Sequence, residues 1–169
     1  MKQVAQLLNG MQAAGVIKNY ALFGAMAQMR YTEAVATLDA DVLIAVPVPG
    51  KLDVLADIYA YCAKLGFSAE GEAIRVGAWP VQFMPAFGAL TNEAMERADV
   101  VDFDGVPLRV ITADYLAVIA LSAGRGKDFA RILALLESPH VTRGQIAALA
   151  LKHGLTEAWN RFEERFIDD

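Results

Sequence analysis

The chain has 169 residues, of which 56% are hydrophobic and 21% are charged, so it predicts one globular domain rather than a disordered or low-complexity segment. Its formal net charge of −5 disfavours nonspecific binding to nucleic acid, DNA included, or to an anionic membrane. One cysteine, Cys62, excludes an intrachain disulfide, and two histidines are too few for a histidine-rich metal site.

The mean hydropathy of +0.34 is high for a protein outside the membrane. No apolar stretch, however, approaches the roughly 18 residues that a spanning helix needs. The first ten residues combine a short apolar run with a helical polar rhythm, which is not typical of a signal peptide. We therefore expect a cytoplasmic protein with no membrane partner.

The first 111 residues alternate between short apolar runs typical of strands and periodic segments typical of helices. The expected strands are 20–23, 41–47, two or three between 67 and 84, 100–103 and 106–110. The expected helices are 1–11, 25–30, 52–65 and 91–97. Asp104-Gly105, between the last two strands, is a strong signal for a two-residue hairpin.

After Thr112 the pattern becomes wholly helical, and Thr112 itself is expected to cap the first of these helices. That helix is apolar nearly all round, so it is expected to be buried. Thr142 and Gln145 form a capping-box pattern that opens a later helix. The sequence thus predicts an α/β part over 1–111 and a helical part over 112–169, packed together as one structural unit.

Two aspartates, Asp39 and Asp41, stand two residues apart at the start of the second expected strand. Residues at this spacing point to one face of a strand, and two carboxylates on one face suit Mg²⁺ completed by water and substrate phosphates. Gly24 lies where a strand gives way to a helix, and a residue without Cβ there would let a phosphate approach the backbone. Alone, the aspartate pair more often simply ends a loop, and Gly24 is more often a turn glycine. Together, in this order, they favour metal-assisted chemistry on a nucleoside triphosphate.

The pattern Gly24-Ala25, thirteen residues and then Asp39-x-Asp41 resembles the signature of the DNA-polymerase-β-like nucleotidyltransferase superfamily. In that superfamily a Gly-Gly or Gly-Ser pair precedes a metal-binding Asp-x-Asp. The more local similarity is to bacterial nucleotidyltransferases of the AbiE (abortive infection, toxin–antitoxin) type. It covers most of the chain, from about residue 16 to 137, through the segments 79–86, 108–112 and 115–128.

This resemblance implies a nucleotidyltransferase-like mixed sheet flanked by helices. It also implies that Asp39 and Asp41 hold Mg²⁺ and act as the catalytic pair, while nucleotide phosphates lie against Gly24 and Ala25. The implied reaction transfers a nucleotidyl group from a nucleoside triphosphate to an RNA or protein hydroxyl and releases pyrophosphate.

The chain departs from the superfamily pattern at three positions: Ala25 replaces the second Gly or Ser, Ala120 stands where a lysine is frequent, and Gln82 stands where catalytic members carry a third carboxylate. An amide oxygen can touch a metal, but it cannot take a proton at neutral pH. Glu70 or Glu72 on the preceding strand could substitute. The alternative function is a catalytically degenerate binding module within a toxin–antitoxin or other protein complex.

The densest basic segment is 124–131, which contains Arg125, Lys127 and Arg131. A basic loop that opens a helix can bind a triphosphate, so Arg125 and Lys127 are candidate nucleotide-binding residues. The competing interpretation is a solvated helix start in which Asp128 and Arg131 form an i, i+3 pair.

Overall fold

The computed structural model describes residues 1–48, 50 and 53–168, and within them seven strands form one mixed sheet of order β3-β4-β5-β2-β1-β7-β6. The strands are β1 (Asn19–Phe23), β2 (Ala40–Ala45), β3 (Ser68–Glu70), β4 (Ala73–Val76), β5 (Trp79–Pro85), β6 (Asp99–Phe103) and β7 (Val106–Val110). Strand β1 pairs antiparallel with β2 and parallel with β7, whereas β2 pairs parallel with β5. The expectation of a mixed sheet flanked by helices is confirmed.

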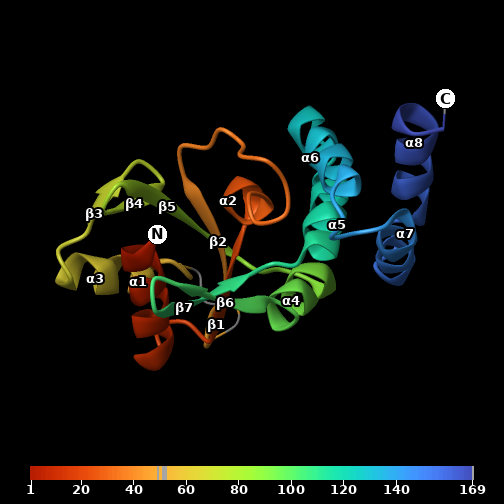
Figure 1. Cartoon of the computed structure of the whole chain (residues 1–169). Helices are drawn as coiled ribbons and strands as arrows, with labels where there is room; N and C mark the ends of the chain where they lie inside the picture. Colours follow the sequence, from red (N-terminus) through yellow and green to blue (C-terminus); the bar gives the residue numbers. More distant parts are fainter. Residues whose placement is uncertain (49, 51–52, 169) are drawn as a thin grey trace.

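The helices of the described residues cover the sheet and then continue beyond it (Figure 1). They are α1 (Lys2–Ala13), α2 (Gly24–Gln28), α3 (Ala56–Lys64), α4 (Ala89–Glu96), α5 (Ala113–Ala123), α6 (Gly126–Glu137), α7 (Arg143–Lys152) and α8 (Thr156–Phe166). Helix α1 packs on β1 and β7, while α2 and α4 both pack on β1 and β2. The three central residues of β1 are fully or almost fully buried, as expected for a strand covered on both faces.

Helix α5 joins the sheet to the C-terminal helices. It contacts α2 and α4 towards the sheet and α6, α7 and α8 away from it. Figure 1 shows these C-terminal helices at the opposite end of the molecule from β3. The expectation that α5 is buried is confirmed, since Leu116, Ala117, Val118 and Ala120 are each at most 2% exposed. The boundary between residues 111 and 112 stays a prediction.

Local signals located most elements to within a few residues. In the β6–β7 hairpin, Asp104 and Gly105 have φ of 53° and 80°, the pair of positive values that a type I′ turn requires. Thr142 caps α7 through the expected box with Gln145. Thr112 does precede α5, but its hydroxyl donates to the Asp114 carboxylate, so the expected cap hydrogen bond is absent. The helix expected from Leu52 begins at Ala56, and Leu52 lies outside the described residues.

Among the described residues, no helix combines the length and the hydropathy needed to cross a bilayer.

A polar cluster centred on Glu93 ties α4 to α5 and α7. The Glu93 carboxylate accepts hydrogen bonds from the Tyr115 hydroxyl and from the Lys152 ammonium. His153 Nε2 lies 3.1 Å from Glu93 Oε2, without the alignment of a hydrogen bond. Glu93 lies on α4, Tyr115 on α5 and Lys152 at the end of α7. The cluster therefore holds the C-terminal helices against the sheet half.

Glu93 should make the stability of the fold sensitive to acid. Hydrogen bonds from Lys152 and Tyr115 lower the pKa of Glu93 from 4.5 to about 2. A carboxylate with a lowered folded pKa stabilises the protein above its unfolded pKa, and that contribution is lost as the pH falls through the folded pKa. We expect the melting temperature to drop between pH 4.5 and about 2 by more in the wild type than in Glu93→Gln, as followed by circular dichroism.

The matched control is Glu157→Gln on α8, because the Glu157 side chain is 91% exposed. This variant should keep the wild-type pH profile. If Glu93→Gln also kept it, the assigned role of Glu93 would be wrong.

Candidate functional site

Three central strands bring the candidate site residues together. In the antiparallel pair of β1 and β2, Phe23 faces Asp41, so Gly24 comes directly after the residue opposite that aspartate. In the parallel pair of β2 and β5, Asp41 faces Gln82. Residues that face each other across neighbouring strands project to the same side of the sheet. Asp41 and Gln82 therefore project to one side of the sheet, and Gly24 lies against Asp41, whose carboxylate a Cβ on Gly24 would overlap.

The Asp41 carboxylate occupies the space that a side chain at residue 24 would need. The φ of Gly24 is +66°, and a Cβ built on this residue would overlap Asp41 Oδ2. Sequence reasoning assigned the missing side chain to the approach of a phosphate. In the structure the missing side chain admits the Asp41 carboxylate, which lies directly against the first turn of α2. Ala25, the next residue, belongs to the same turn.

Asp39 and Asp41 form a close acidic pair. Gln82 Nε2 donates a hydrogen bond of 3.0 Å to Asp39 Oδ2, and Thr37 Oγ1 donates one of 3.0 Å to the Asp39 carbonyl. Burial, and then the negative charge of Asp39, raise the pKa of Asp41. Two neighbouring carboxylates also attract a cation.

Basic residues from α6 and the residue before it face this pair. The charges of Arg131, Lys127 and Arg125 act on Asp41 and partly offset the rise in its pKa. Arg125 also holds Asp128, whose side chain is 1% exposed, through a contact of 2.6 Å, while Arg131 lies 3.6 Å from the same carboxylate. Burial works against the charged form of Asp128, but the hydrogen bonds of Arg125 and the charge of Arg131 outweigh it and lower its pKa.

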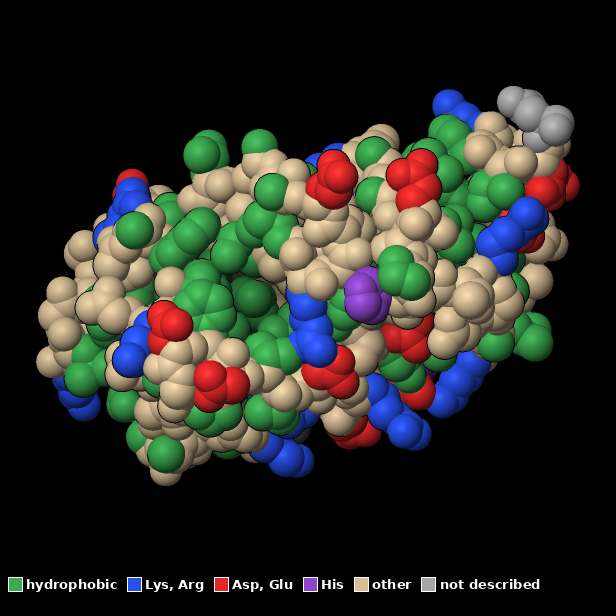
Figure 2. Space-filling view, in the orientation of Figure 1, with side chains coloured by type: hydrophobic (Ala, Val, Ile, Leu, Met, Phe, Trp, Pro, Cys, Tyr) green, Lys and Arg blue, Asp and Glu red, His purple; other side chains and the backbone are tan. Residues whose placement is uncertain are grey.

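Arg131 is the site residue that sequence reasoning did not select. Its side chain is only 16% exposed, and its Nε donates 3.0 Å to Gln28 Oε1 on α2. The predicted i, i+3 pair with Asp128 exists, yet Arg131 also joins α6 to the helix that carries Gly24. A signal was present in the sequence, because Lys127 and Arg131 are four residues apart and share a helix face. On the face drawn in Figure 2, basic and acidic side chains are interspersed and form no broad basic surface.

The expectation that Glu70 or Glu72 supplies a third carboxylate is wrong. Glu70 lies on the edge strand β3, with β4 and β5 between it and β2, a separation of roughly 14 Å. Its carboxylate is bound by Arg75 at 2.6 Å. Glu72 follows directly in the β3–β4 turn, at the same edge of the sheet. In the part of the chain that the structure describes, no group of three or more His, Cys, Asp or Glu side chains could hold a metal.

The donor set fits one Mg²⁺ ion but not two. Asp39 and Asp41 offer hard carboxylate oxygens, and Mg²⁺ is commonly held by one or two carboxylates together with substrate phosphates and water. A second ion would need a further carboxylate, and Gln82 presents an amide that already donates to Asp39. The residues therefore suit a single Mg²⁺ ion whose remaining positions are filled by other oxygen ligands.

Solved structures provide the comparison. The chain matches an antigenic nucleotidyltransferase-like protein from Paracoccidioides brasiliensis with a TM-score of 0.54 and 13% identity, over 93% of this chain and 90% of that one. The chain has a nucleotidyltransferase-like fold. It also matches ANT(2")-Ia, solved in complex with adenylyl-2"-tobramycin, with a TM-score of 0.50 and 13% identity, over 96% and 97% of the two chains. No protein-family model and no curated protein matches the sequence.

Gly24→Ala should destabilise the protein through two separate effects. An alanine at this positive φ costs roughly 1–2 kcal/mol, and the overlap with Asp41 should add about 1–3 kcal/mol. Gly15→Ala is the matched control, because Gly15 has φ of +71° and nothing within 4 Å of a new Cβ. Urea denaturation measures both losses in the free energy of unfolding.

A double-mutant cycle isolates the overlap. In an Asp41→Ala background, Gly24→Ala should cost clearly less than in the wild type, because the carboxylate is gone and only the Cβ of residue 41, at 3.3 Å, still crowds the new methyl group. An unchanged cost in that background would show that Asp41 does not constrain Gly24.

Proposed function

We propose that this chain is a nucleotidyltransferase that binds a nucleoside triphosphate with Mg²⁺ and transfers a nucleotidyl group to an RNA or protein hydroxyl. The observation that carries the proposal is Asp41, which packs against Gly24, lies beside the charge of Asp39 and is acted on by the basic residues of α6. The nucleotidyltransferase-like fold supports it. Within that superfamily, the order of the sequence motifs favours the AbiE type of bacterial toxin–antitoxin systems.

Each residue has a proposed task. Asp39 and Asp41 would hold the Mg²⁺, and the phosphates would lie against Gly24 and Ala25 and be neutralised by Lys127, Arg125 and Arg131. Mg²⁺ in such a site neutralises phosphate charge and makes the α-phosphorus easier to attack.

In the proposed transfer, the acceptor oxygen forms a bond to the α-phosphorus. The bond from that phosphorus to the oxygen bridging to the β-phosphate breaks, and pyrophosphate leaves. The acceptor proton passes to water, because no third carboxylate lies beside Asp39 and Asp41 among the described residues.

A degenerate binding module is the second candidate. The observation that favours it is the Gln82 amide, which donates to Asp39 from the strand position where catalytic members carry a carboxylate. Such a protein would bind the nucleotide or a protein partner without transferring a nucleotidyl group.

Calorimetric titration of each nucleoside triphosphate, with and without Mg²⁺, tests the site. The wild type should bind at least one triphosphate in a metal-dependent manner, and Asp39→Ala/Asp41→Ala should weaken that binding by at least about tenfold. Asp104→Asn in the exposed hairpin is the matched control, since asparagine tolerates its φ of 53°. If the double variant bound the nucleotide as tightly as the wild type, the assignment of Asp39 and Asp41 to the proposed site would be wrong.

Pyrophosphate release separates the two candidate functions. A catalytic protein should release pyrophosphate from α-labelled nucleotide in the presence of its acceptor, and Gln82→Asp should raise the rate because it supplies a base. A binding module should retain Mg²⁺-dependent nucleotide binding and release none. The labelled product, followed by thin-layer chromatography, distinguishes transfer from simple hydrolysis.

A further inference from the structure

Strand β6 forms an edge of the sheet, and part of its backbone points away from its neighbour. Among the described residues β6 pairs only with β7. On β7, Pro107 has no N–H, and its carbonyl accepts a hydrogen bond of 2.7 Å from the Asn9 side chain of α1. The N–H of Ile111, which follows β7, donates to the Leu22 carbonyl of β1. Backbone groups alternate between the two sides of a strand, so the odd-numbered residues of β7 face away from β6 and the even-numbered residues face it.

The register of the hairpin identifies the backbone groups that are left over. Asp99, Val101 and Phe103 stand opposite the even-numbered residues of β7, the arrangement in which facing residues exchange hydrogen bonds. The N–H and C=O groups of Val100 and Asp102 therefore point outward. Outside the hairpin, neither residue has a backbone hydrogen bond to the part of the chain that the structure describes, and both are exposed. These two residues offer two donors and two acceptors to a further strand.

An apolar groove of about 370 Å³ lies beside this edge. Val101 and Phe103 of β6 line it, together with the three methionines Met1, Met26 and Met29. Methionine side chains are flexible and polarisable, so they adapt to apolar partners of different shape. Side chains of an added strand that stood opposite Val101 and Phe103 would lie on the same face of the sheet and reach the groove. The outward backbone of β6 and the groove therefore form one surface, the β6 surface.

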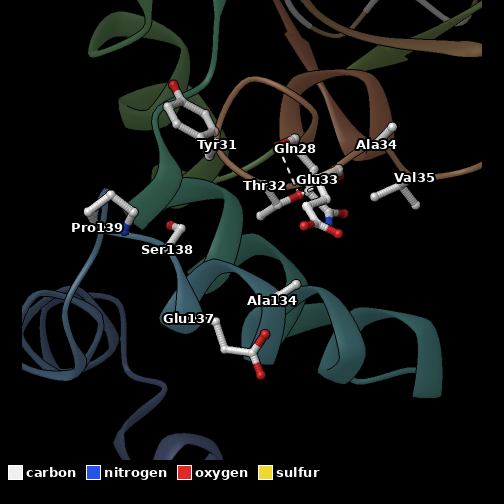
Figure 3. A pocket seen from close by; sticks show the side chains of 10 residues that line it. All are labelled: Gln28, Tyr31, Thr32, Glu33, Ala34, Val35, Ala134, Glu137, Ser138 and Pro139. Carbon is white, nitrogen blue, oxygen red and sulfur yellow. Dashed lines mark hydrogen bonds between the residues drawn. The ribbon is translucent and has the colours of Figure 1, made fainter.

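The charged groups of the β6 surface are mainly acidic. Asp99, Asp102 and Asp104 lie along the strand and its turn, and the last two form no ion pair with a described residue. Arg30 lines the groove, but it is paired with Asp99 at 3.2 Å. Its guanidinium also lies 5.4 Å from the ring centre of Tyr31, which lines a separate cavity between α6 and the loop after α2 (Figure 3). A lysine or arginine opposite Asp102 would therefore form a favourable cross-strand pair, whereas an acidic residue there would be repelled.

A second copy of the chain matches the β6 surface poorly. Two β6 strands side by side would bring the three aspartates of each copy to one seam, and each chain has a formal net charge of −5. Like charges gathered on one edge of a sheet oppose the pairing of strands there. The charge therefore favours a segment of another protein that carries basic and apolar side chains.

We propose that β6 binds an extended basic and apolar segment of a partner protein as an additional strand of the sheet. Hydrogen bonds to the backbone of Val100 and Asp102 supply affinity, and alternate side chains supply specificity. On one face the segment presents a lysine or arginine to Asp102. On the other face it places apolar side chains over the groove, beside Val101 and Phe103. The β6 surface is separate from the proposed nucleotide site, because β7 and β1 lie between β6 and β2.

Fluorescence anisotropy with two labelled peptides tests the charge preference: Thr-Ile-Lys-Val-Val-Lys and Thr-Ile-Glu-Val-Val-Glu. We expect the lysine peptide to bind the wild type about tenfold more tightly than the glutamate peptide. Asp102→Asn should reduce this preference several-fold, because it removes the charge that faces the lysine. The variant keeps the side-chain oxygen that accepts the Gly105 N–H at 3.1 Å, so the turn is preserved.

Val100→Pro tests the strand pairing itself. Proline removes the outward N–H but none of the bonds to β7, and an edge strand tolerates proline where the N–H faces solvent. We expect binding of the lysine peptide to weaken by about tenfold, with the fold retained by circular dichroism. Val100→Thr keeps the N–H and is the matched control. Hydrogen exchange of the wild type is a second readout, in which the amides of Val100 and Asp102 should become protected when the peptide binds.

Four results would overturn the proposal: no binding of the lysine peptide, equal binding of the two peptides, equal binding by a folded Val100→Pro variant and the wild type, or hydrogen-exchange protection that leaves out Val100 and Asp102. Light scattering tests the second copy, since a wild-type dimer that Val100→Pro dissociates would mean that β6 binds another copy of this chain instead. Asp39→Ala/Asp41→Ala should bind the lysine peptide as the wild type does, so the outcome does not depend on the proposed function.

Discussion

The contact between the Asp41 carboxylate and Gly24 is the constraint on which the rest of the site depends. It follows from the register of β1 and β2, which places Asp41 opposite Phe23 and leaves the next residue of β1 to turn into α2. A slip of one residue would exchange the two faces of β2 and bring Val42, which is fully buried, to the position of Asp41. The apolar core thus fixes the register, and the register fixes the acidic pair.

The charges of the site come from both halves of the chain. The first half contributes Asp41 from β2 and Asp39 from the residue just before that strand, and α6 contributes Lys127 and Arg131. Burial lowers the pKa of Arg131, an unfavourable effect that the charges of Asp128 and Asp41 oppose. Docking of α6 is therefore favoured by the carboxylates that it faces. The same contact between α6 and Asp41 therefore sets the charge of the site and helps to hold the helical half in place.

The sequence predicted what is encoded locally. The Asp104-Gly105 hairpin, the Thr142 box and the buried strands around Gly24 and Asp41 each depend on a few adjacent residues. The contacts that complete the site join residues far apart in the chain, as in the bond from Gln82 to Asp39. The hydrophobic pattern of a sequence does not reveal the order of strands in a sheet. The sequence therefore could not show that β4 and β5 separate Glu70 from Asp41. For the same reason the position of Arg131 against α2 could not be predicted.

Gln82 shows how stability and chemistry compete at this position. A third carboxylate there would add negative charge beside Asp39 and Asp41, in a place where burial and repulsion already raise the pKa of Asp41. The amide instead donates a hydrogen bond to Asp39 and adds no charge, so without a bound cation it favours the folded state. An acidic residue becomes the better choice only if the chemistry needs a base that water cannot replace. The amide at residue 82 therefore favours the stability of the acidic pair over the supply of a base.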